Sequence, residues 1–288
     1  MGEKRRHDSD SGSGSGSGSE SDTGKGKQAA TEDYSDSDSL KSNEIVDVDF
    51  DFFDFQPADF HSLKPMLAAS FGDDSDMFNL SELADMILYQ NAIGSTVKVD
   101  GESDPYAFMS VLGMKQHKDR EAIRQVREYL LKKAGRQRDQ LGKLLDASNV
   151  GLLFNERVVN MPPQIVVPML RMLMEETQRA VDAHEPFDFE YFVLLCPMYR
   201  EVAADDSDTE EPPGKPGQEG LDAHGRVEDE FIEEFAHLKF DFKFSKLKRV
   251  ADARNTFADT GLLPSRRCLV IHRSQISPII ARLESVLE

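Results

Sequence analysis

Histidine and cysteine are the side chains most often used for nucleophilic and metal chemistry, and this sequence spaces them for neither. The seven histidines are His7, His61, His117, His184, His224, His237 and His272. They include no pair at zinc-ligand spacing, and the two cysteines form no Cys-x-x-Cys motif. The chain also lacks Gly-x-Ser-x-Gly and a phosphate loop ending in Gly-Lys-Ser/Thr. The sequence therefore predicts no catalytic, metal-binding or cofactor-binding residues.

Carboxylates are the chemical groups in which the chain is rich. It has 34 Lys and Arg against 53 Asp and Glu, a formal net charge of −19, and a sequence pI near 4.8. Such a charge disfavours general nucleic-acid binding and favours solubility or basic partners. Two acidic runs are therefore the candidate partner-binding residues. They are Asp205, Asp206, Asp208, Glu210 and Glu211, followed by Glu228, Asp229, Glu230, Glu233 and Glu234.

A third group of acids, Asp47, Asp49 and Asp51, raises the question of a metal site. These residues alternate with apolar ones at the period of two that is typical of a strand. A calcium loop instead wraps its ligands around the ion with the help of a Gly turn, which this stretch lacks. We interpret residues 45–55 as an acidic edge strand, whose charge repels unwanted strand pairing.

Three short polar stretches have two interpretations each. Ser35, Ser37, Ser207 and Thr209 each precede an acid, so they are either acceptors for an acidophilic kinase or parts of a solvated acidic run. Lys4, Arg5 and Arg6 are either a minimal nuclear-import cluster or an incidental charged start. The sequence alone leaves these alternatives open.

Residues 117–147 are the basic exception in an acidic chain. Apolar residues at helical spacing predict a helix there. Its cations include Arg120, Arg124, Arg127, Lys132, Lys133, Arg136, Arg138 and Lys143. A basic helix face is compatible with nucleic-acid binding. The simpler interpretation is a solvated face that pairs with the chain's own acidic segments.

These residues need a fold to hold them, and residues 150–202 predict its centre. Val150–Phe154 is a short apolar run, typical of a strand that is buried on both faces. Two consecutive prolines favour a helix that starts near Met161, and Pro168 should bend it. Phe187–Cys196 begins with alternation and becomes apolar throughout, which predicts a second strand. Strand, helix and strand make a βαβ unit with parallel strands and a right-handed connection.

The rest of the chain adds elements on either side of this unit. Apolar periodicity predicts strands at 45–55, 93–99, 107–114, 238–244 and 267–271, with a long bent strand from Phe231 as an alternative start for the fourth. It predicts helices at 59–71, at 80–88 and after Ser274. The resulting fold class is α/β, with a central mixed sheet and helices on both faces.

Composition divides the chain into a polar tail and one folded domain. Residues 1–43 contain a Ser-Gly repeat and almost no aliphatic side chains, so we expect a disordered tail. Residues 44–288 should form a single domain with a disordered acidic loop at 203–226. No apolar run reaches the ~18 residues of a membrane span, and Cys196 and Cys268 are expected to be buried, reduced thiols. We therefore expect a soluble intracellular monomer.

Several phrases of the sequence resemble the BCCIP family of eukaryotic nuclear proteins, whose fungal members are called BCP. The phrases are Gln90–Lys98, Gly151–Met169, the strand from Tyr191, the acidic approach to Leu238–Phe242, and Val270–Leu287. The resemblance implies a fold like that of the GCN-type N-acetyltransferases without their enzymatic equipment. It also implies protein binding in the nucleus. The implied roles are chaperoning a ribosomal protein of the large subunit, supporting the export of a lipid kinase, and association with recombination and cell-cycle regulators.

An acetyltransferase would need a pyrophosphate loop at a strand-to-helix junction, because backbone N–H groups at a helix start bind the phosphates. The junction here is Asn160-Met-Pro-Pro-Gln164, and its two prolines remove two of those donors. We therefore predict a non-enzymatic nuclear adaptor or chaperone without a cofactor, which binds a basic client and shuttles to the cytoplasm. The alternatives are a degenerate acyltransferase and a nucleic-acid-binding protein that uses residues 117–147.

Overall fold

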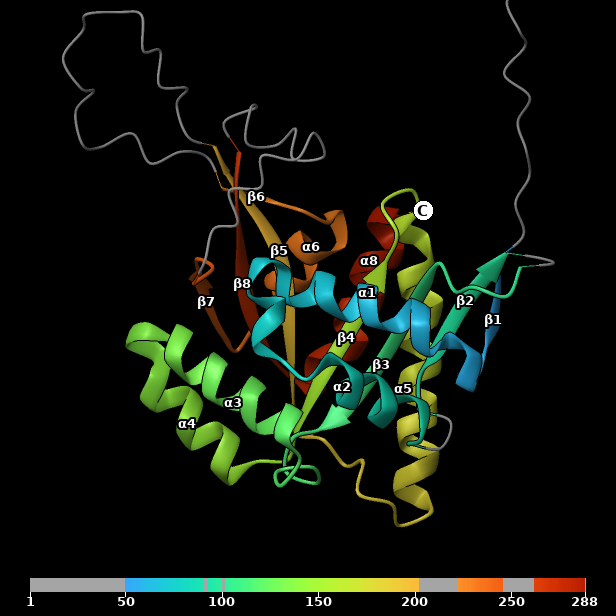
Figure 1. The fold of residues 1–288 in the computed structure, drawn as a ribbon, viewed down its shortest axis with the longest axis horizontal. Helices are drawn as coiled ribbons and strands as arrows, with labels where there is room; N and C mark the ends of the chain where they lie inside the picture. The colour runs from blue at the N-terminus through green and yellow to red at the C-terminus, as the bar shows by residue number, and fades with distance from the viewer. Residues whose placement is uncertain (1–49, 91–92, 100–101, 202–221, 246–261, 288) are drawn as a thin grey trace, which may run out of the picture. The chain divides into compact units, whose positions relative to one another are not determined.

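Eight strands form one mixed sheet at the centre of the fold (Figure 1). The computed structural model describes residues 50–90, 93–99, 102–201, 222–245 and 262–287. The strands are β1 (Phe50–Phe53), β2 (Ser95–Val99), β3 (Ala107–Gly113), β4 (Val150–Arg157), β5 (Tyr191–Glu201), β6 (Asp222–His224), β7 (Leu238–Phe242) and β8 (Leu262–His272). Their order is β1-β2-β3-β4-β5-β8-β7, and β6 pairs with β5. Of these pairs only β4 with β5 is parallel.

Helices flank this sheet. The α-helices in the described part of the chain are α1 (Phe60–Phe71), α2 (Leu80–Leu88), α3 (Glu121–Lys133), α4 (Arg138–Ala147), α5 (Val166–Asp182), α6 (Val227–Glu233) and α8 (Ile276–Leu287). Short 3-10 turns precede or follow several of them, at Pro57–Asp59, Gly72–Met77, Gly135–Gln137, Pro163–Ile165 and Arg273–Gln275. Within that part, the combination of length and apolarity that a membrane-crossing helix requires does not occur.

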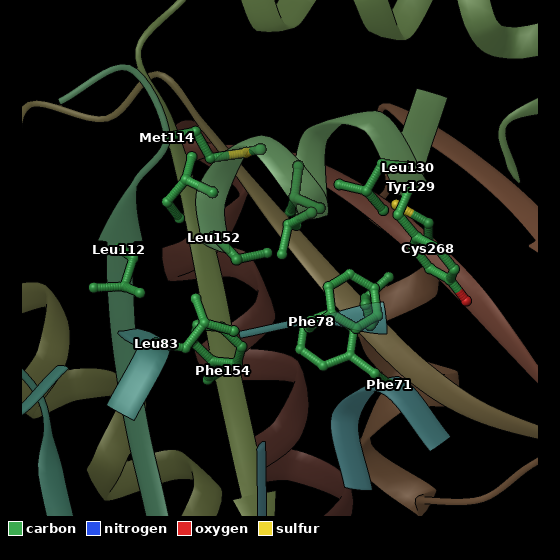
Figure 2. Close-up of a cluster of buried hydrophobic side chains, with 14 of the residues drawn as sticks. Phe71, Phe78, Leu83, Leu112, Met114, Tyr129, Leu130, Leu152, Phe154 and Cys268 are labelled. Carbon is green, nitrogen blue, oxygen red and sulfur yellow. The ribbon is translucent and has the colours of Figure 1, made fainter. Parts of the chain in front are cut away.

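One face of the sheet is covered by α1, α2 and α3, with α4 packed on α3. Their apolar stripes meet strand residues such as Leu112 and Leu152 in one buried cluster (Figure 2). The rings of Phe71 and Phe78 stack with their centroids 3.9 Å apart, and Tyr129 stands edge-on to Phe78 at 5.0 Å. Such ring pairs add packing energy to the burial of their large apolar surface. This cluster anchors the helices that lie near the N-terminal half of the fold.

The opposite face is covered by α5 and α8. Leu170 and Leu173 of α5 and Leu283 of α8 are buried together with strand residues such as Leu194 and Leu269. The helices repeat their apolar residues three or four positions apart, so each presents one stripe to the sheet. Buried clusters on both faces confirm the predicted fold class, a mixed α/β fold with helices on each side of a central sheet.

The predicted strand–helix–strand unit is confirmed with shifted ends. β4 and β5 are parallel, and α5 lies between them in the chain. β4 extends beyond the predicted run to Arg157, whereas β5 begins only at Tyr191. A bend at Pro168 is no longer expected, because Pro168 is the third residue of α5 and lies in its first turn. A residue in the first turn has no intrahelical acceptor for its N–H, so proline there costs little.

The predicted loop at 203–226 is shorter than expected. Residues 202–221 lie outside the described residues, but Asp222–His224 form β6, which pairs with β5. The bent strand considered from Phe231 is wrong, because α6 occupies that stretch. β7 confirms the strand predicted after it. Leu238, Phe240 and Phe242 are buried in alternation with exposed residues.

Other boundaries also moved. The helix predicted over 117–147 is two helices, α3 and α4, joined by a turn in which Gly135 has φ 51°. A left-handed φ is easy for glycine and ends α3 without strain. β1 is the edge strand expected at 45–55, although residues before Phe50 lie outside the described residues, as does the tail at 1–43. Cys196 and Cys268 are confirmed as buried free thiols.

Candidate functional site

Charged residues from distant parts of the chain meet at the end of β4. The parallel register of β4 and β5 stops at Leu153 and Leu194. β4 continues to Arg157 alongside β3, and its last residues are bonded to α6 and to the residue before it. We call the charged side chains at this junction the β4–α6 cluster. They are Glu156, Arg157, Arg226, Glu228 and Asp229.

Arg157 and Glu228 form a two-pronged ion pair within the cluster. Arg157 Nη1 donates to Glu228 Oε1, and Arg157 Nη2 donates to Glu228 Oε2 over 2.9 Å. The Glu228 side chain is fully buried and that of Arg157 is 10% exposed. A buried carboxylate without a cation costs several kcal/mol, on the order of 3–5. The ion pair therefore permits the burial of Glu228 and ties the end of β4 to the first turn of α6.

Arg226 makes a second ion pair with the neighbouring residue of β4. Its guanidinium donates to Glu156 Oε2 and to the backbone oxygen of Asn155. The other oxygen of Glu156 accepts a hydrogen bond from Ser70 Oγ of α1 over 2.6 Å. Burial opposes the charged form of Arg226, but the carboxylates of Glu156, Asp229 and Glu228 outweigh it and raise its pKa. The cluster thus connects helices on both faces of the sheet through β4.

Asp229 is the acid of the cluster that lacks a matching donor. It is 1% exposed, and neither carboxylate oxygen has a hydrogen-bond partner among the described residues. Burial raises its pKa to about 7, a shift that Arg226 opposes and Glu228 reinforces. Burial and the Asp229 charge also raise the pKa of the Cys196 thiol. Asp229 therefore titrates near neutral pH although no solvent reaches it.

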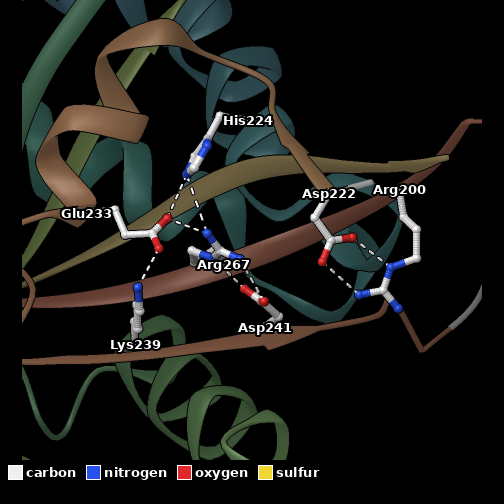
Figure 3. A network of polar contacts seen from close by, with 7 residues as sticks. All are labelled: Arg200, Asp222, His224, Glu233, Lys239, Asp241 and Arg267. Carbon is white, nitrogen blue, oxygen red and sulfur yellow. Dashed lines mark hydrogen bonds and ion pairs between the residues drawn. The ribbon is translucent and has the colours of Figure 1, made fainter. Parts of the chain in front are cut away.

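A second charged network lies on the sheet beside α6 (Figure 3). Arg267 of β8 donates to Glu233 of α6 and to Asp241 of β7. Glu233 also accepts from Lys239 over 2.6 Å and lies 2.7 Å from His224 Nε2. Burial would raise the pKa of Glu233, but these hydrogen bonds outweigh burial and lower the pKa to about 2. The charge of Glu233 is therefore balanced within the fold.

A further ion pair lies where the acidic segment 202–221 leaves and re-enters the sheet. Arg200 of β5 donates to both oxygens of Asp222 in β6, over 2.7 and 3.0 Å. The same two residues face each other in the β5–β6 register. The segment 202–221 thus begins and ends at two adjacent, paired strands (Figure 3).

The structure separates the predicted partner-binding acids into groups. Asp205, Asp206, Asp208, Glu210 and Glu211 lie outside the described residues, as do Lys4, Arg5, Arg6, Ser35, Ser37, Ser207 and Thr209. Glu228 and Asp229 are buried, which corrects the expectation that they present charge to a partner. Glu233 is engaged by three cationic or imidazole groups. Glu230 in α6 and Glu234 just after the helix are exposed, and Glu234 pairs with Arg282. The binding of partners by these two acids stays a prediction.

Sequence reasoning missed the pairing within the cluster. Glu156 and Arg157 are sequence neighbours of opposite charge, which favours an ion pair between them, but neighbours in a strand point to opposite faces. Each finds its partner near the start of α6 instead, Glu156 with Arg226 and Arg157 with Glu228. The available signal was the order Arg226-Val-Glu-Asp, in which a cation and two acids flank the start of a short apolar stripe. That order predicts that charged residues lie near the start of a helix, but it does not predict which strand supplies their partners.

The basic surface of α3 and α4 is partly used by the fold itself. Arg120 pairs with Glu82, Arg127 with Asp146 and Lys133 with Asp74. On α3, α4 and the turn between them, the exposed cations that have no ion pair with a described residue are Arg124, Lys132, Arg136, Arg138 and Lys143. The exposed acids Glu121, Glu128, Asp139 and Asp146 lie among them. Mixed signs weaken the field that a phosphate backbone would meet. The arrangement favours the solvated face over the nucleic-acid alternative.

The charged side chains of these clusters stabilise the fold by pairing with one another. The Arg157–Glu228 and Arg226–Glu156 pairs of the β4–α6 cluster are almost closed to solvent, so a substrate cannot reach them. Within the described ranges no three His, Cys, Asp or Glu side chains come together in a way that could hold a metal ion. What remains accessible is charge on the surface, at α6 and at the ends of β5 and β6.

Comparisons with known proteins agree on one family. A family model described as BCCIP matches residues 45–235. Protein bcp1 of Schizosaccharomyces pombe is 38% identical over 266 residues, which cover 88% of this chain and 94% of that protein. Protein BCP1 of Debaryomyces hansenii is 34% identical over 269 residues, covering 85% and 87%. None of these names is that of an enzyme.

A solved structure shares the fold. The crystal structure of BCP1 from Saccharomyces cerevisiae matches with a TM-score of 0.60 and 26% identity, covering 86% of this chain and 92% of that one. The expected likeness to the GCN-type N-acetyltransferases is not tested by this match and stays a prediction.

Proposed function

The chain belongs to the BCCIP family, as its sequence phrases predicted, and we propose that it is a non-enzymatic nuclear adaptor or chaperone for basic protein clients. A ribosomal protein of the large subunit is the first client that the family resemblance suggests. Ribosome biogenesis and nuclear export, including export of a lipid kinase, are the processes it would serve. Recombination and cell-cycle regulators are the further partners of this proposal.

One observation supports the proposal most directly: the acidic residues 202–221 connect β5 to β6, and α6 follows β6 directly in the chain. Residues 202–221 contain six carboxylates and one lysine. The segment leaves β5 after Glu201 and returns at Asp222 in β6, four positions before Arg226, which directly precedes α6. Glu230 of α6 is exposed, as is Glu234 just after the helix, where Glu234 also pairs with Arg282. The acidic segment is therefore joined to the end of the sheet at which α6 presents an exposed acid.

Concentrated charge on one surface has a defined physical effect on binding. It attracts a client rich in Lys and Arg over distances longer than a contact and orients it before docking. Salt at physiological strength screens such attraction beyond roughly 8 Å, so the association rate should fall as salt rises. Shape and apolar contacts then select among basic clients.

Binding of a purified large-subunit ribosomal protein to the full chain tests the proposal. Two variants remove acidic charge, and we expect each to slow association. The first neutralises the acidic segment, with Asp205, Asp206 and Asp208 changed to Asn and Glu210 and Glu211 changed to Gln. The second combines Glu230→Gln with Glu234→Gln. The matched control is Glu128→Gln with Asp139→Asn, which removes two exposed acids from α3 and α4. Association should fall with salt for the wild type and the control alike, and less steeply for the neutralised chains.

Two results would count against the proposal. If high salt left the amount of bound client unchanged and all variants associated at the same rate, the acidic residues would not steer the client. Absence of binding to any basic protein in nuclear extract, with and without the acidic residues, would remove the function as a whole.

A further inference from the structure

A concave site lies at the opposite end of the sheet from α6, where β3 ends and β4 begins. It has a volume of about 440 Å³ and opens to solvent. Its walls come from the end of α2, from the turn before α3, and from the residues after α5. The residues that matter for its chemistry are Asp85, Tyr89, Gln90, His117, Arg120 and Glu185. We call it the Tyr89 pocket.

The backbone holds the carboxylate wall in place. The N–H of His184 donates to Val181 O and that of Glu185 to Ala180 O, two bonds that close the end of α5. His184 has φ 64°, a left-handed conformation that usually requires glycine at this position of a helix end. The turn therefore directs Glu185 away from the α5 axis and beside the pocket. On the other wall, the N–H of Tyr89 donates to Asp85 O and caps α2.

The charge of the lining is negative. Asp85 and Glu185 have no ion-pair partner among the described residues. The one cation of the lining, Arg120, is held by Glu82, with 2.8 Å between Nε and Oε1. Glu82 also accepts from the N–H of Ala122, which fixes it against the start of α3. The Arg120 charge is thereby balanced outside the pocket, and two carboxylates are left unbalanced within it.

Two buried polar atoms of the wall, Gln90 Oε1 and His117 Nε2, have no hydrogen-bond partner among the described residues. The amide of Gln90 cannot be turned over, because its Nε2 donates to Ile93 O and to Ser110 Oγ over 3.1 and 2.7 Å. Its oxygen is therefore an unused acceptor. Burial and the nearby Arg120 charge lower the pKa of His117, so its ring is neutral at pH 7. A neutral ring adds no positive charge to the wall.

Tyr89 completes the lining with an aromatic side chain that is 70% exposed. An aromatic face attracts a guanidinium or an ammonium group, and carboxylates bind the same groups by charge and hydrogen bonds. An anion would meet two carboxylates instead. The combination of two carboxylates and an exposed ring is thus selective for a cation.

We propose that the Tyr89 pocket binds an arginine or lysine side chain of a basic protein. The assignment of that side chain to a client rests on the proposed function, whereas the chemistry of the pocket does not. The end of α2 lines the pocket, and Figure 1 shows α2 and α6 toward opposite ends of β4. A client steered by the acidic end would therefore have a second, separate anchor.

Short blocked peptides that contain a single arginine test the pocket with the full chain. Nuclear magnetic resonance titration should shift the amide signals of Tyr89, His117 and Glu185 as the arginine peptide is added. A matched peptide with citrulline, which has the same shape but no charge, should bind about tenfold more weakly. A lysine peptide separates the two cations, and a glutamate peptide should leave these signals unmoved.

Variants assign the effect to the pocket. Asp85→Asn with Glu185→Gln should weaken the arginine peptide about tenfold, and Tyr89→Leu about threefold. The control Glu128→Gln with Asp139→Asn should change nothing. Equal binding of citrulline, shifts centred away from Tyr89, or full affinity in the Asp85 and Glu185 double variant would each overturn the inference.

The two proposals fail separately. If the ribosomal protein binds the wild type and the double variant alike, and the arginine peptide moves no pocket signal, the pocket inference is wrong and the adaptor function stands. If the arginine peptide saturates the pocket but no basic protein binds the chain, the pocket inference stands and the adaptor function fails.

Discussion

Arg157 of β4 and Glu228 of α6 are separated by 71 positions in the chain, yet they form a two-pronged ion pair that solvent hardly reaches. The pair joins the last residue of a strand to the first turn of a seven-residue helix. So short a helix has little stability of its own. Its position therefore depends on contacts such as this one.

Removing one partner of this pair should be costly. Glu228→Gln would leave the guanidinium of Arg157 buried without a counter-charge, and we expect the free energy of unfolding to fall by about 3–5 kcal/mol in urea denaturation. Arg171→Met is the control, since the Arg171–Glu284 pair is 53% and 30% exposed and should be worth less than ~1 kcal/mol. The double variant Arg157→Met with Glu228→Leu should lose less than the sum of its single changes. Equal losses for buried and exposed pairs would refute this view of the cluster.

The raised pKa of Asp229 should make stability depend on pH. Its usual value is 3.8 and its value in the folded protein is about 7. Between these values the folded chain keeps a proton that the unfolded chain has released, so stability falls as pH rises through this window. The slope of this contribution approaches ~1.4 kcal/mol per pH unit.

Asp229→Asn removes the titrating group and isolates this contribution. The amide carries a fixed cost that is the same at every pH, so the difference in unfolding free energy between variant and wild type should shift in favour of the variant from about pH 4.5 to about pH 6.5. Urea denaturation across this range measures it. Parallel curves for the two proteins would show that Asp229 titrates elsewhere.

Gly151 in β4 is expected to tolerate no side chain. A Cβ there would lie 2.5 Å from Val111 Cγ2 and 3.2 Å from the Phe189 ring. Gly151→Ala should therefore lower the free energy of unfolding by about 1–3 kcal/mol, and Val111→Ala in the same chain should recover part of the loss. Gly142→Ala in α4 is the control, because its Cβ would meet only Leu131 at 3.6 Å and should stabilise the helix by about 0.5–1 kcal/mol. A loss at Gly151 that Val111→Ala does not relieve would place the clash elsewhere.

The start of α5 should not bind a nucleotide-bearing cofactor. Pro162 and Pro163 carry no N–H, so two donors of a phosphate cradle are missing where β4 leads into the helix. Calorimetric titration with acetyl-CoA should give no saturating heat. A saturating signal that Pro163→Gly enhances would revive the acyltransferase alternative.

Much of the sheet could be predicted from local pattern. Val150–Phe154 is apolar without a break, and β4 is buried along that run. Leu238, Phe240 and Phe242 alternate with polar residues, and β7 shows one buried and one exposed face. In both cases burial by neighbouring elements follows the period of the residues themselves, so the sequence contains the information.

The candidate site could not be predicted in the same way. Glu228, Asp229, Glu230, Glu233 and Glu234 are similar in type and close in sequence, yet they range from fully buried to exposed. Which acid is buried depends on Arg157 and Arg226 and on the strand that brings them together. Local composition has no access to a partner 71 positions away. The same reason explains why local pattern left a strand from Phe231 open as an alternative, where α6 lies.

Because β5 and β6 pair with each other, the structure of the sheet should depend little on the length and composition of the residues that connect them. Arg200 and Asp222 fix the entry and exit of residues 202–221 side by side. Lengthening a connection whose ends are already closed costs little, roughly 0.6 kcal/mol for each doubling. Residues 202–221 can therefore be replaced by a segment of another length or acid content, in evolution or by design, without a change in the register of β5 and β6.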